Sequence, residues 1–372
     1  MMFIFLFLIS LNLYPLKFHK AKVKPVVNRN YLPVLIDLVN NAKKEIKFLI
    51  FQARYYSGYR NDPGRQIIDA LIRAKKRGVY VEGVLDYSEW NKSNTIKNYQ
   101  FSFLLKQAGI KVYFDPMPVT SHPKIVMVDS QYLLIGSTNW SFYALKSNNE
   151  ANILIKSPEV VKEFLDYYEL VKSLGDTLPD RYKIKPEKRR PEESSASPPS
   201  IDIPPYKGDW IDGEVMVIPN RLYIWAFYRI LKNAKKEIKV AMLKAPPSLN
   251  RKYSSNELLL RVLNKLAERG VKIDILFENS NYAYSIYLQN KDFADLLVDK
   301  NVDVWFDRPD IGLHAKLVVI DDYLTILGST NWTYYAFELN NETAVVIKSK
   351  KVAKYYKWYI EQLKKAGAFH YK

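Results

Sequence analysis

Two histidines of this 372-residue chain are followed by the same polar residues at the same spacing. A lysine comes two residues after each histidine, an aspartate seven, a serine fifteen and an asparagine seventeen. The first set is His122, Lys124, Asp129, Ser137 and Asn139, and the second is His314, Lys316, Asp321, Ser329 and Asn331. The chain has only four histidines, so this duplicate placement of two of them is a poor fit to chance.

These residue types suit phosphoryl transfer. One imidazole can attack phosphorus and form a covalent intermediate, while a second protonates the leaving oxygen and then acts as base. Lysine ammonium and asparagine amide groups stabilise charge on the non-bridging oxygens. We therefore expect a catalytic set that also includes both aspartates, with Asn139, Asn331, Ser137 and Ser329 binding substrate. We choose His122 as the histidine that attacks.

A glutamate follows each histidine at 28 residues, Glu150 after His122 and Glu342 after His314. A carboxylate there could bind the second nitrogen of each imidazole and fix its tautomer. Carboxylates with metal-ligand spacing are not found near the histidines, so the sequence predicts chemistry without a metal or other cofactor.

Each of these residues also has a structural interpretation. A single histidine on a strand is more often structural than catalytic, but the paired lysine and the duplication argue against that here. Asp129 and Asp321 stand at expected turns, where aspartate is common, so a structural or lysine-orienting role competes with catalysis. Trp140 and Trp332 are better read as core or pocket wall than as base-stacking surfaces.

The histidine motifs belong to a longer internal repeat. Residues 41–47 recur as residues 233–239, an offset of 192, and residues 136–140 recur as 328–332 at the same offset. The register holds from about residue 28 to residue 175, which indicates a duplicated domain. Residues 41–47 have no evident chemistry, so identity between the halves does not by itself prove catalysis.

The pattern of each half alternates strands and helices. In the first half we expect helices at residues 31–42, 66–77, 101–108 and 158–173, and strands at residues 46–51, 79–85, 110–114, 124–128, 132–135 and 151–155. This order favours two tandem α/β domains, each a mixed sheet between helices, related by pseudo-two-fold symmetry. Residues two apart on a strand face the same side, so each histidine and its lysine should project together.

The domains are expected at residues 25–176 and 209–372. Residues 177–208 between them are rich in proline, serine and charge, which is typical of an exposed linker. Residues 1–20 begin with an apolar run that is short for a spanning helix, so we expect an export signal or a membrane anchor, with a buried strand as the alternative. The protein should then be exported, periplasmic or anchored to a membrane.

Composition restricts the partners. The net charge is +17, which favours a polyanionic partner, either nucleic acid or an anionic membrane, although a lysine-rich surface can also reflect heat adaptation. The chain has no cysteine, which excludes disulfides, zinc–thiolate sites and cysteine nucleophiles. Two motifs in one chain remove the need for a second subunit, so we expect a monomer.

The doubled H-x-K-x4-D-x6-G-S-x-N pattern resembles the phospholipase D superfamily, and the resemblance covers nearly the whole chain after about residue 25. It implies that both motifs meet in one site, that one histidine becomes phosphorylated, and that Glu150 and Glu342 orient the histidines. The family normally needs no metal, and both motifs are intact here.

The superfamily contains phospholipases, phosphatidyltransferases and nucleases. We expect a phosphodiester hydrolase that releases phosphatidic acid from phospholipid. A metal-independent nuclease is the alternative, a phosphatidyltransferase resembling cardiolipin synthases is less favoured, and a binding protein without activity should have lost one motif.

Overall fold

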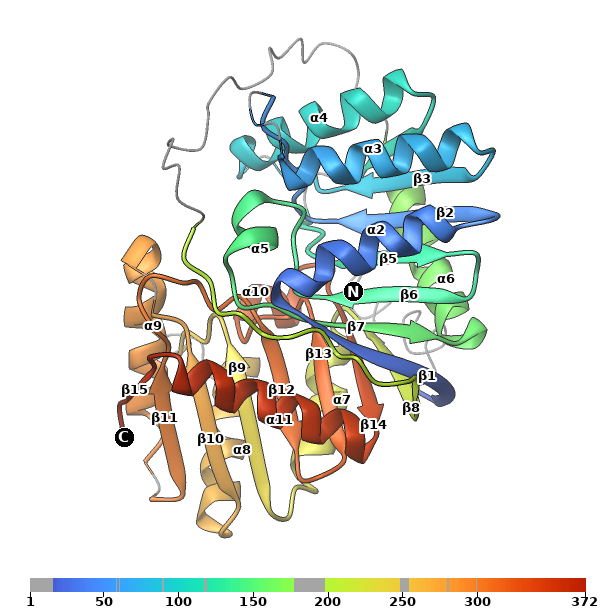
Figure 1. Cartoon of the computed structure of the whole chain (residues 1–372). Helices are drawn as coiled ribbons and strands as arrows, with labels where there is room; N and C mark the ends of the chain where they lie inside the picture. The colour runs from blue at the N-terminus through green and yellow to red at the C-terminus, as the bar shows by residue number, and fades with distance from the viewer. Residues whose placement is uncertain are drawn as a thin grey trace, which may run out of the picture.

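The computed structural model describes residues 16–57, 59, 61–88, 90–116, 119–176, 198–247, 254–279, 281–298 and 300–372. One mixed sheet runs through both halves, and helices cover both of its faces, as Figure 1 shows. The first half contains β1 (Phe18–Val27), α2 (Tyr31–Asn41), β2 (Glu45–Ile50), α3 (Pro63–Lys76), β3 (Tyr80–Leu85), α4 (Lys92–Gln107), β4 (Lys111–Phe114), β5 (Lys124–Val128), β6 (Tyr132–Gly136), α5 (Phe142–Lys146), β7 (Ala151–Lys156) and α6 (Pro158–Leu174). The duplicated α/β fold expected from the sequence is confirmed.

The second half repeats this order of elements and adds a short strand at its end. It contains β8 (Ile211–Pro219), α7 (Leu222–Leu231), β9 (Glu237–Met242), α8 (Ser255–Glu268), β10 (Lys272–Phe277), α9 (Tyr284–Asp295), β11 (Val302–Phe306), β12 (Lys316–Ile320), β13 (Leu324–Gly328), α10 (Tyr334–Glu338), β14 (Thr343–Lys348), α11 (Lys350–Lys365) and β15 (Phe369–His370). Single turns of 3-10 helix lie at Asn28–Asn30 and Asn281–Ala283. The strand order is β15-β11-β10-β9-β12-β13-β14-β8-β1-β7-β6-β5-β2-β3-β4.

The two halves join at the centre of the sheet. Strands β1 and β8 pair antiparallel, from Phe18 opposite Met216 to Val23 opposite Ile211. The other edge of β1 pairs with β7, and that of β8 pairs with β14. Burying four neighbouring strands together removes apolar side chains of both halves from water, which is the main favourable contribution to folding. The halves therefore form one continuous structure.

Strand β1 corrects the expected start of the first domain. The sequence predicts a signal or anchor over residues 1–20 and a domain from residue 25, but β1 begins at Phe18. Val23, Val26 and Val27 are buried in this strand. Residues 1–15, which carry most of the apolar run, lie outside the described residues. Strand pairing thus extends the folded body seven residues before the expected boundary.

The end of the expected linker also packs against the body. Ile201 and Ile203 are buried, although the sequence predicts an exposed linker up to residue 208. The Asn30 side-chain amide donates to the Ile203 carbonyl at 2.9 Å, and the Arg29 guanidinium donates to the Ile201 carbonyl. These side chains donate the hydrogen bonds that water would otherwise give to the linker carbonyls. The prediction of an exposed segment, made from composition alone, was therefore wrong for these residues. Residues 177–197 lie outside the described part of the chain.

Local sequence signals explain both ends of helix α3. Helix α3 begins after Asp62, whose side chain accepts from the Arg65 amide at 2.8 Å, and it ends before Gly78, which has a φ of 91°. Helix α4 is longer than expected, beginning at Lys92 rather than near residue 101. Its first turns bury polar side chains such as Asn98, which donates to the Phe51 carbonyl at 2.8 Å. Buried polar residues hide the apolar periodicity, so the sequence pattern missed those turns.

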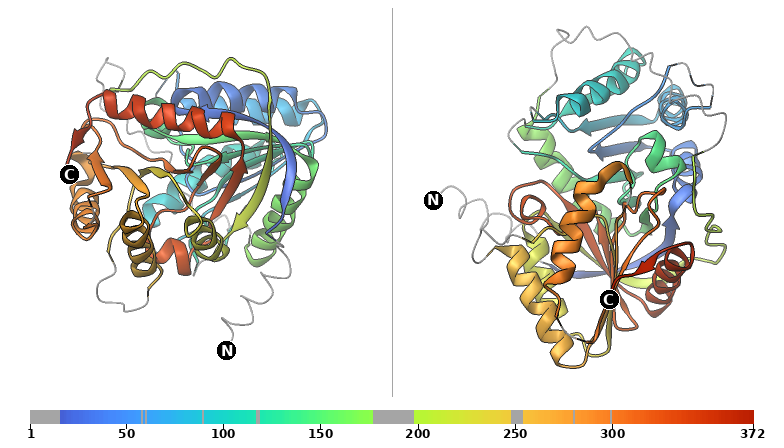
Figure 2. Two further views of the ribbon diagram at one scale, coloured as in Figure 1. Left: turned by 90° about the horizontal axis from the view of Figure 1, so that it is seen from below. Right: turned by 90° about the vertical axis from the view of Figure 1, so that its left-hand side faces the viewer.

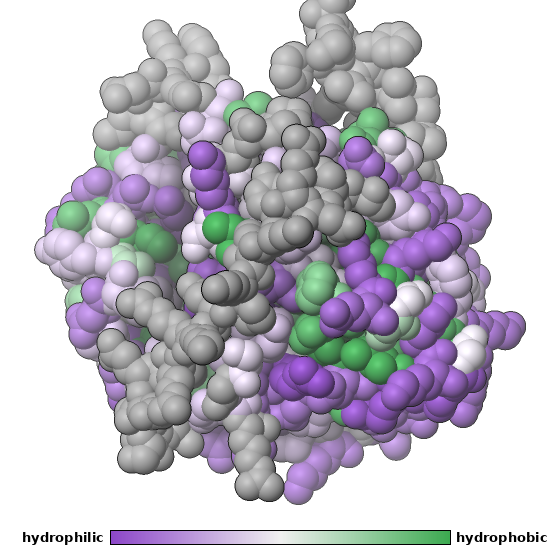
Figure 3. Space-filling view, turned by 90° about the horizontal axis from the view of Figure 1, so that it is seen from above, coloured by the Kyte–Doolittle hydropathy of each residue, from purple (hydrophilic) through white to green (hydrophobic). Residues whose placement is uncertain are grey.

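The two outer edges of the sheet differ. On the second half, β15 pairs with β11, from Trp305 opposite His370 to Phe306 opposite Phe369. On the first half, the outer edge of β4 has, among the described residues, a single bridge between Phe114 and Asp176. Figure 3 views the molecule from the first-half end, where hydrophilic residues surround a smaller hydrophobic area.

Candidate active site

The two motifs lie where the halves meet. Ser121 bridges to Asn341, and Asn149 bridges to Leu313, so the segment before each histidine runs beside the segment before the other half's glutamate. The His122 amide donates to the Asn341 carbonyl at 2.9 Å, and the His314 amide donates to the Asn149 carbonyl at 2.9 Å. Each histidine loop is thus held by the opposite half, and one site contains both.

Each glutamate binds the histidine of the other half. His122 Nδ1 lies 3.0 Å from Glu342 Oε2, and His314 Nδ1 lies 3.0 Å from Glu150 Oε2. The glutamates are fully buried, and the imidazoles are 12% and 15% exposed. The sequence identified both glutamates but not their exchange across the interface. Because Nδ1 is engaged, Nε2 is the nitrogen left for chemistry on each ring.

Burial is the largest influence on the pKa values of the two histidines. Removal from water lowers the pKa of His122 to about 4 and also lowers that of His314. Burial opposes ionisation of Glu150, but the nearby His314 and Lys316 leave its pKa below the usual range. Without a bound anion both imidazoles are therefore mainly neutral near pH 7, which suits the histidine that attacks, whereas the histidine that acts as acid must take up a proton when an anionic substrate binds.

The two motif lysines begin strands β5 and β12 and are almost completely buried. Lys124 Nζ donates to the His122 carbonyl, and Lys316 Nζ donates to the His314 carbonyl at 2.5 Å. Burial is the largest cause that lowers the pKa of Lys316, to about 8, and that brings the pKa of Lys124 well below its usual range. A bound anion would offset the free-energy cost of burying two ammonium groups. The site therefore favours a bound phosphodiester.

The serines bind the glutamates, which corrects the expectation that they bind substrate. Ser137 Oγ donates to Glu150 Oε2, and Ser329 Oγ donates to Glu342 Oε2 at 2.5 Å. The glycines before them permit this close packing: a Cβ on Gly136 would lie 2.4 Å from the Ala151 carbonyl oxygen. The serines thus position the carboxylates that position the histidines.

The asparagines keep a polar group unengaged. Asn139 is 8% exposed, and its Oδ1 has no hydrogen-bond partner among the described residues. Asn331 Oδ1, at the equivalent position of the second half, also has no hydrogen-bond partner among the described residues. Buried polar atoms usually find partners, so this repeated exception fits groups that bind substrate.

The aspartates lie away from the histidines, which corrects their expected place in the catalytic set. Asp129 follows β5 five residues after Lys124, about 16 Å along the strand. Its carboxylate accepts from the backbone amides of Lys43 and Lys44 at 2.9 and 2.7 Å. Asp321 binds the Lys236 amide at 2.8 Å in the same way. The unchanged stretches at residues 41–47 and 233–239 supply these donors, which explains their identity without catalysis.

Sequence reasoning missed a buried acid behind each histidine loop. Asp86 Oδ1 accepts from the Ser121 amide at 3.0 Å, and Glu278 Oε2 accepts from the Leu313 amide. Burial raises the pKa of Asp86 to about 6, and burial and Asp86 raise that of its neighbour Asp115 to about 8. The only signal was position, because residues 86 and 278 are offset by 192 and both acidic.

A pair of asparagines that supports the glutamates was also missed. Asn28 and Asn220 have φ values of 51°, and their side chains accept from the Glu150 and Glu342 amides at 2.8 and 2.9 Å. Asparagine tolerates this left-handed conformation better than most residues do. Tyr359 of α11 donates to Asn28 at 2.6 Å, so the last helix of the second half supports the first half's glutamate.

Two expectations remain, one for the tryptophans and one for metal binding. Trp140 and Trp332 have no exposed surface and belong to the core, as the sequence indicates. Among the described residues, no group of three or more His, Cys, Asp or Glu is arranged to hold a metal ion.

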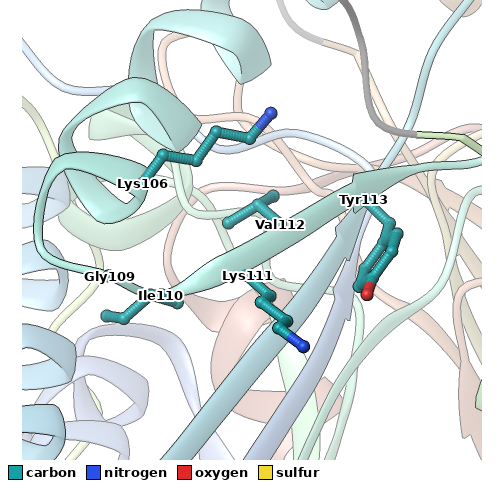
Figure 4. Close-up of a pocket in the computed structure, with 6 residues that line it drawn as sticks. All are labelled: Lys106, Gly109, Ile110, Lys111, Val112 and Tyr113. Carbon is teal, nitrogen blue, oxygen red and sulfur yellow. The ribbon is translucent and has the colours of Figure 1, made fainter.

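A hollow of about 400 Å³ lies apart from the histidines, at the edge strand β4. Figure 4 shows Lys106 at the end of α4 and Lys111 and Tyr113 on β4 around it. None of its lining residues belongs to the repeated motif, so this hollow is separate from the candidate active site.

The sequence matches a known family twice. The family model described as "Cardiolipin synthase, PLD-like domain" matches residues 35–171 and again residues 227–364. Cardiolipin synthase B of Escherichia coli (strain K12) is 24% identical over 338 residues, covering 86% of this chain and 74% of that protein. A phospholipase D of Rickettsia typhi is 34% identical over 99 residues, covering 27% of this chain and 46% of that protein.

The fold resembles that of a solved structure along its whole length. Phosphatidylserine synthase of Haemophilus influenzae Rd KW20 superimposes with a TM-score of 0.72 at 15% identity, covering 97% of this chain and 90% of that chain. At this identity the likeness shows the fold alone.

Proposed function

We propose that this chain, which belongs to the family of cardiolipin synthase PLD-like domains in the phospholipase D superfamily, transfers a phosphatidyl group from a phospholipid to an alcohol. The superfamily expected from the sequence is confirmed, and the protein is an enzyme of that superfamily. The observation that carries the proposal is the pair of exchanged contacts, His122 with Glu342 and His314 with Glu150. They bring two imidazoles and two lysines to one site suited to a single phosphodiester.

Transfer to an alcohol replaces hydrolysis as the preferred reaction. The sequence favours hydrolysis to phosphatidic acid, whereas the relative that matches 86% of this chain is named a cardiolipin synthase. Water and an alcohol enter the same second step, so the two reactions differ only in the acceptor. The nuclease alternative is not favoured by these relatives.

The first step forms a covalent intermediate on His122. Its Nδ1 is held by Glu342, so the neutral Nε2 attacks phosphorus and a P–N bond forms. The bond from phosphorus to the headgroup oxygen breaks, and His314 gives that oxygen a proton, so an alcohol leaves. The proton on His314 is favoured by Glu150 at 3.0 Å and by the bound phosphodiester anion.

The second step restores the enzyme. His314, now neutral, takes the proton of the incoming alcohol, and the alcohol oxygen attacks phosphorus. The P–N bond breaks, His122 is released, and the product is a new phosphodiester. Lys124 and Lys316 stabilise the charge on the non-bridging oxygens in both steps, and Asn139 and Asn331 would bind the same group through their amides.

A membrane location is part of this proposal because the substrate is a lipid. The apolar residues 1–15 support an exported or membrane-anchored protein. None of the helices in the described residues is long and apolar enough to span a membrane.

The test uses the full chain, phosphatidylglycerol vesicles and EDTA. We expect glycerol release together with a lipid that carries two phosphatidyl groups, identified by mass spectrometry. Added alcohols should be phosphatidylated in competition. Phosphatidic acid as the sole product would make the enzyme a hydrolase. Cleavage of DNA or RNA with vesicles untouched would make it a nuclease. Activity lost in EDTA and restored by a divalent metal would overturn the metal-free mechanism.

His122→Ala and His314→Ala proteins serve as blanks for each substrate. Product that persists in both blanks would come from a contaminant, and product absent from both assigns the reaction to this site.

A further inference from the structure

Two exposed aromatic residues occupy equivalent positions in the two halves. Trp90 and Tyr282 are offset by 192, and each is 70% exposed. Single exposed aromatic residues are common on soluble proteins and need no explanation. Here the aromatic character is kept at both places, although little of either side chain is packed in the interior.

Both residues stand against the loops that lead to the histidines. Trp90 Nε1 donates to Thr120 Oγ1 at 2.8 Å, two residues before His122. The Tyr282 hydroxyl lies against Gly312, two residues before His314, where a Cβ would be 2.1 Å from it. Each ring therefore lies against the loop that leads to one motif histidine.

A second equivalent pair lies on the short helices after the motifs. Tyr143 on α5 is 58% exposed, and Tyr335 on α10 is 61% exposed. Arg29 donates to the Ser147 carbonyl at 2.6 Å and so supports the end of α5. Arg221 supports α10 through the Leu339 carbonyl at 2.7 Å. The helices that carry these tyrosines are thus held by partly buried, charge-assisted hydrogen bonds.

The two pairs are brought together by contacts between the halves. The Asn149 amide, just after α5, donates to the Gly312 carbonyl at 2.8 Å. The Asn341 amide, just after α10, donates to the Thr120 carbonyl at 2.9 Å. The segment after α5 thus meets the loop that Tyr282 contacts, and the segment after α10 meets the loop that Trp90 contacts. Helices α5 and α9 lie on the left of Figure 1, and the right panel of Figure 2 looks onto that side.

We propose that Trp90, Tyr143, Tyr282 and Tyr335, here named the aromatic rim, dock the protein on an anionic phospholipid bilayer with the active site facing the lipid headgroups. Tryptophan and tyrosine suit the bilayer interface because one end of the ring is apolar and the other is polar. The net charge of +17 complements an anionic surface. The inference rests on the proposed function and adds how a membrane substrate reaches His122 and His314.

The docking surface has a direct spectroscopic test. The full chain is mixed with phosphatidylglycerol vesicles that contain lipids brominated on the acyl chains, which quench nearby tryptophan. We expect quenching in the unchanged protein that is largely lost in Trp90→Tyr, since the other half already has tyrosine at this place. Equal quenching in both proteins would overturn the proposal, because the apolar N-terminus alone would then explain binding.

A second measurement separates docking from catalysis. The rate on phosphatidylglycerol vesicles is divided by the rate on a short-chain phosphatidylglycerol that is monomeric in solution. We expect this ratio to fall about tenfold in Trp90→Ser/Tyr282→Ser. The matched control, Phe103→Ser/Tyr323→Ser, removes two exposed aromatic residues that lie elsewhere. An unchanged ratio in the rim variant, or an equal fall in the control, would count against docking by the rim.

Failure of the proposed function and failure of the docking proposal would give different results. A protein that turns over neither lipid but still shows Trp90-dependent quenching would refute the proposed function and keep the docking surface. Quenching of Trp90 by single-stranded oligonucleotides but not by brominated lipid would refute docking and make the rim a base-stacking surface.

Discussion

The first half places an aromatic ring beside its motif, and the second half places an aliphatic side chain there. Phe51 contacts the His122 ring at 4.7 Å between centroids and lies 5.0 Å from Lys124 Nζ. The equivalent residue is Leu243. Its backbone is bound in the same way, because the Phe51 and Leu243 amides donate to the Pro123 and Ala315 carbonyls. The two histidines thus have the same backbone hydrogen bonds nearby but different side chains around them, so their chemical roles can differ.

The supporting acids differ as well. Asp86 binds the histidine loop of the first half, whereas the longer Glu278 does so in the second half. The apolar surroundings of His122 favour its neutral, nucleophilic form, which supports the choice of His122 for attack. The comparison teaches that duplication preserved the motif residues while their environments diverged, which allows the two histidines to take different roles.

The largest expected effect comes from removing either histidine. His122→Ala and His314→Ala should each lower turnover by about 10³-fold or more, because both rings act on one phosphodiester. Half of the activity remaining in either variant would mean that the halves work independently.

Trapping the intermediate sharpens the same comparison. His314→Asn removes both the acid of the first step and the base of the second, so with long incubation we expect a phosphatidyl group on a peptide that contains His122, detected by mass spectrometry. A phosphopeptide containing His314 in His122→Asn, with none on His122, would reverse the assignment.

The exchanged glutamates should give the next largest effect. Glu150→Gln and Glu342→Gln should each lower turnover by about 10²-fold, because an amide does not stabilise the imidazolium or fix its tautomer as a carboxylate does. In single-turnover experiments, Glu342→Gln should slow formation of the phosphoenzyme, since Glu342 binds His122.

The exposed Glu268 offers the control, as Glu268→Gln removes a carboxylate without touching the site. Loss of activity in Glu268→Gln equal to that in Glu342→Gln would point to a general effect of charge.

The turn aspartates should affect stability and not chemistry. Asp129→Ala and Asp321→Ala should each lower the free energy of unfolding by about 1.5–3 kcal/mol, through loss of charge-assisted hydrogen bonds to backbone amides. Turnover per folded molecule should stay within about threefold. Denaturant titration and active-site counting measure the two quantities. A hundredfold loss of turnover with unchanged stability would return these residues to the catalytic set.

The last prediction concerns the dependence of stability on pH. The pKa of His122 is about 4 in the folded protein, against about 6.5 in an unfolded chain. As pH falls from 6.5 to 4, the unfolded state takes up the proton first, so the free energy of unfolding should decrease by up to about 3 kcal/mol from this residue. His122→Phe should show a shallower fall over that range. Parallel stability curves for the two proteins would contradict the lowered pKa.

The sequence by itself determined the repeat and the alternation of elements, and it singled out the candidate reacting groups. A fixed offset of 192 exposed the duplication, and Gly78 marked the end of a helix through local backbone chemistry. Histidine, lysine and asparagine stood out because the same set occurs in both halves and few chemistries use these residue types together. These signals depend on neighbours in sequence, so they are readable without a fold.

The tertiary structure alone decided how those groups pair. Glu150 serves His314 across 164 residues, Ser137 turns toward Glu150 rather than substrate, and Asp129 turns away to the backbone at residues 43–45. Strand β1 joins the halves at the centre of the sheet, and its first three residues, 18–20, fall in the segment expected to be a signal or anchor. Such contacts arise when distant segments bury their surfaces together, and the periodicity of one segment contains no information about which distant partner it meets.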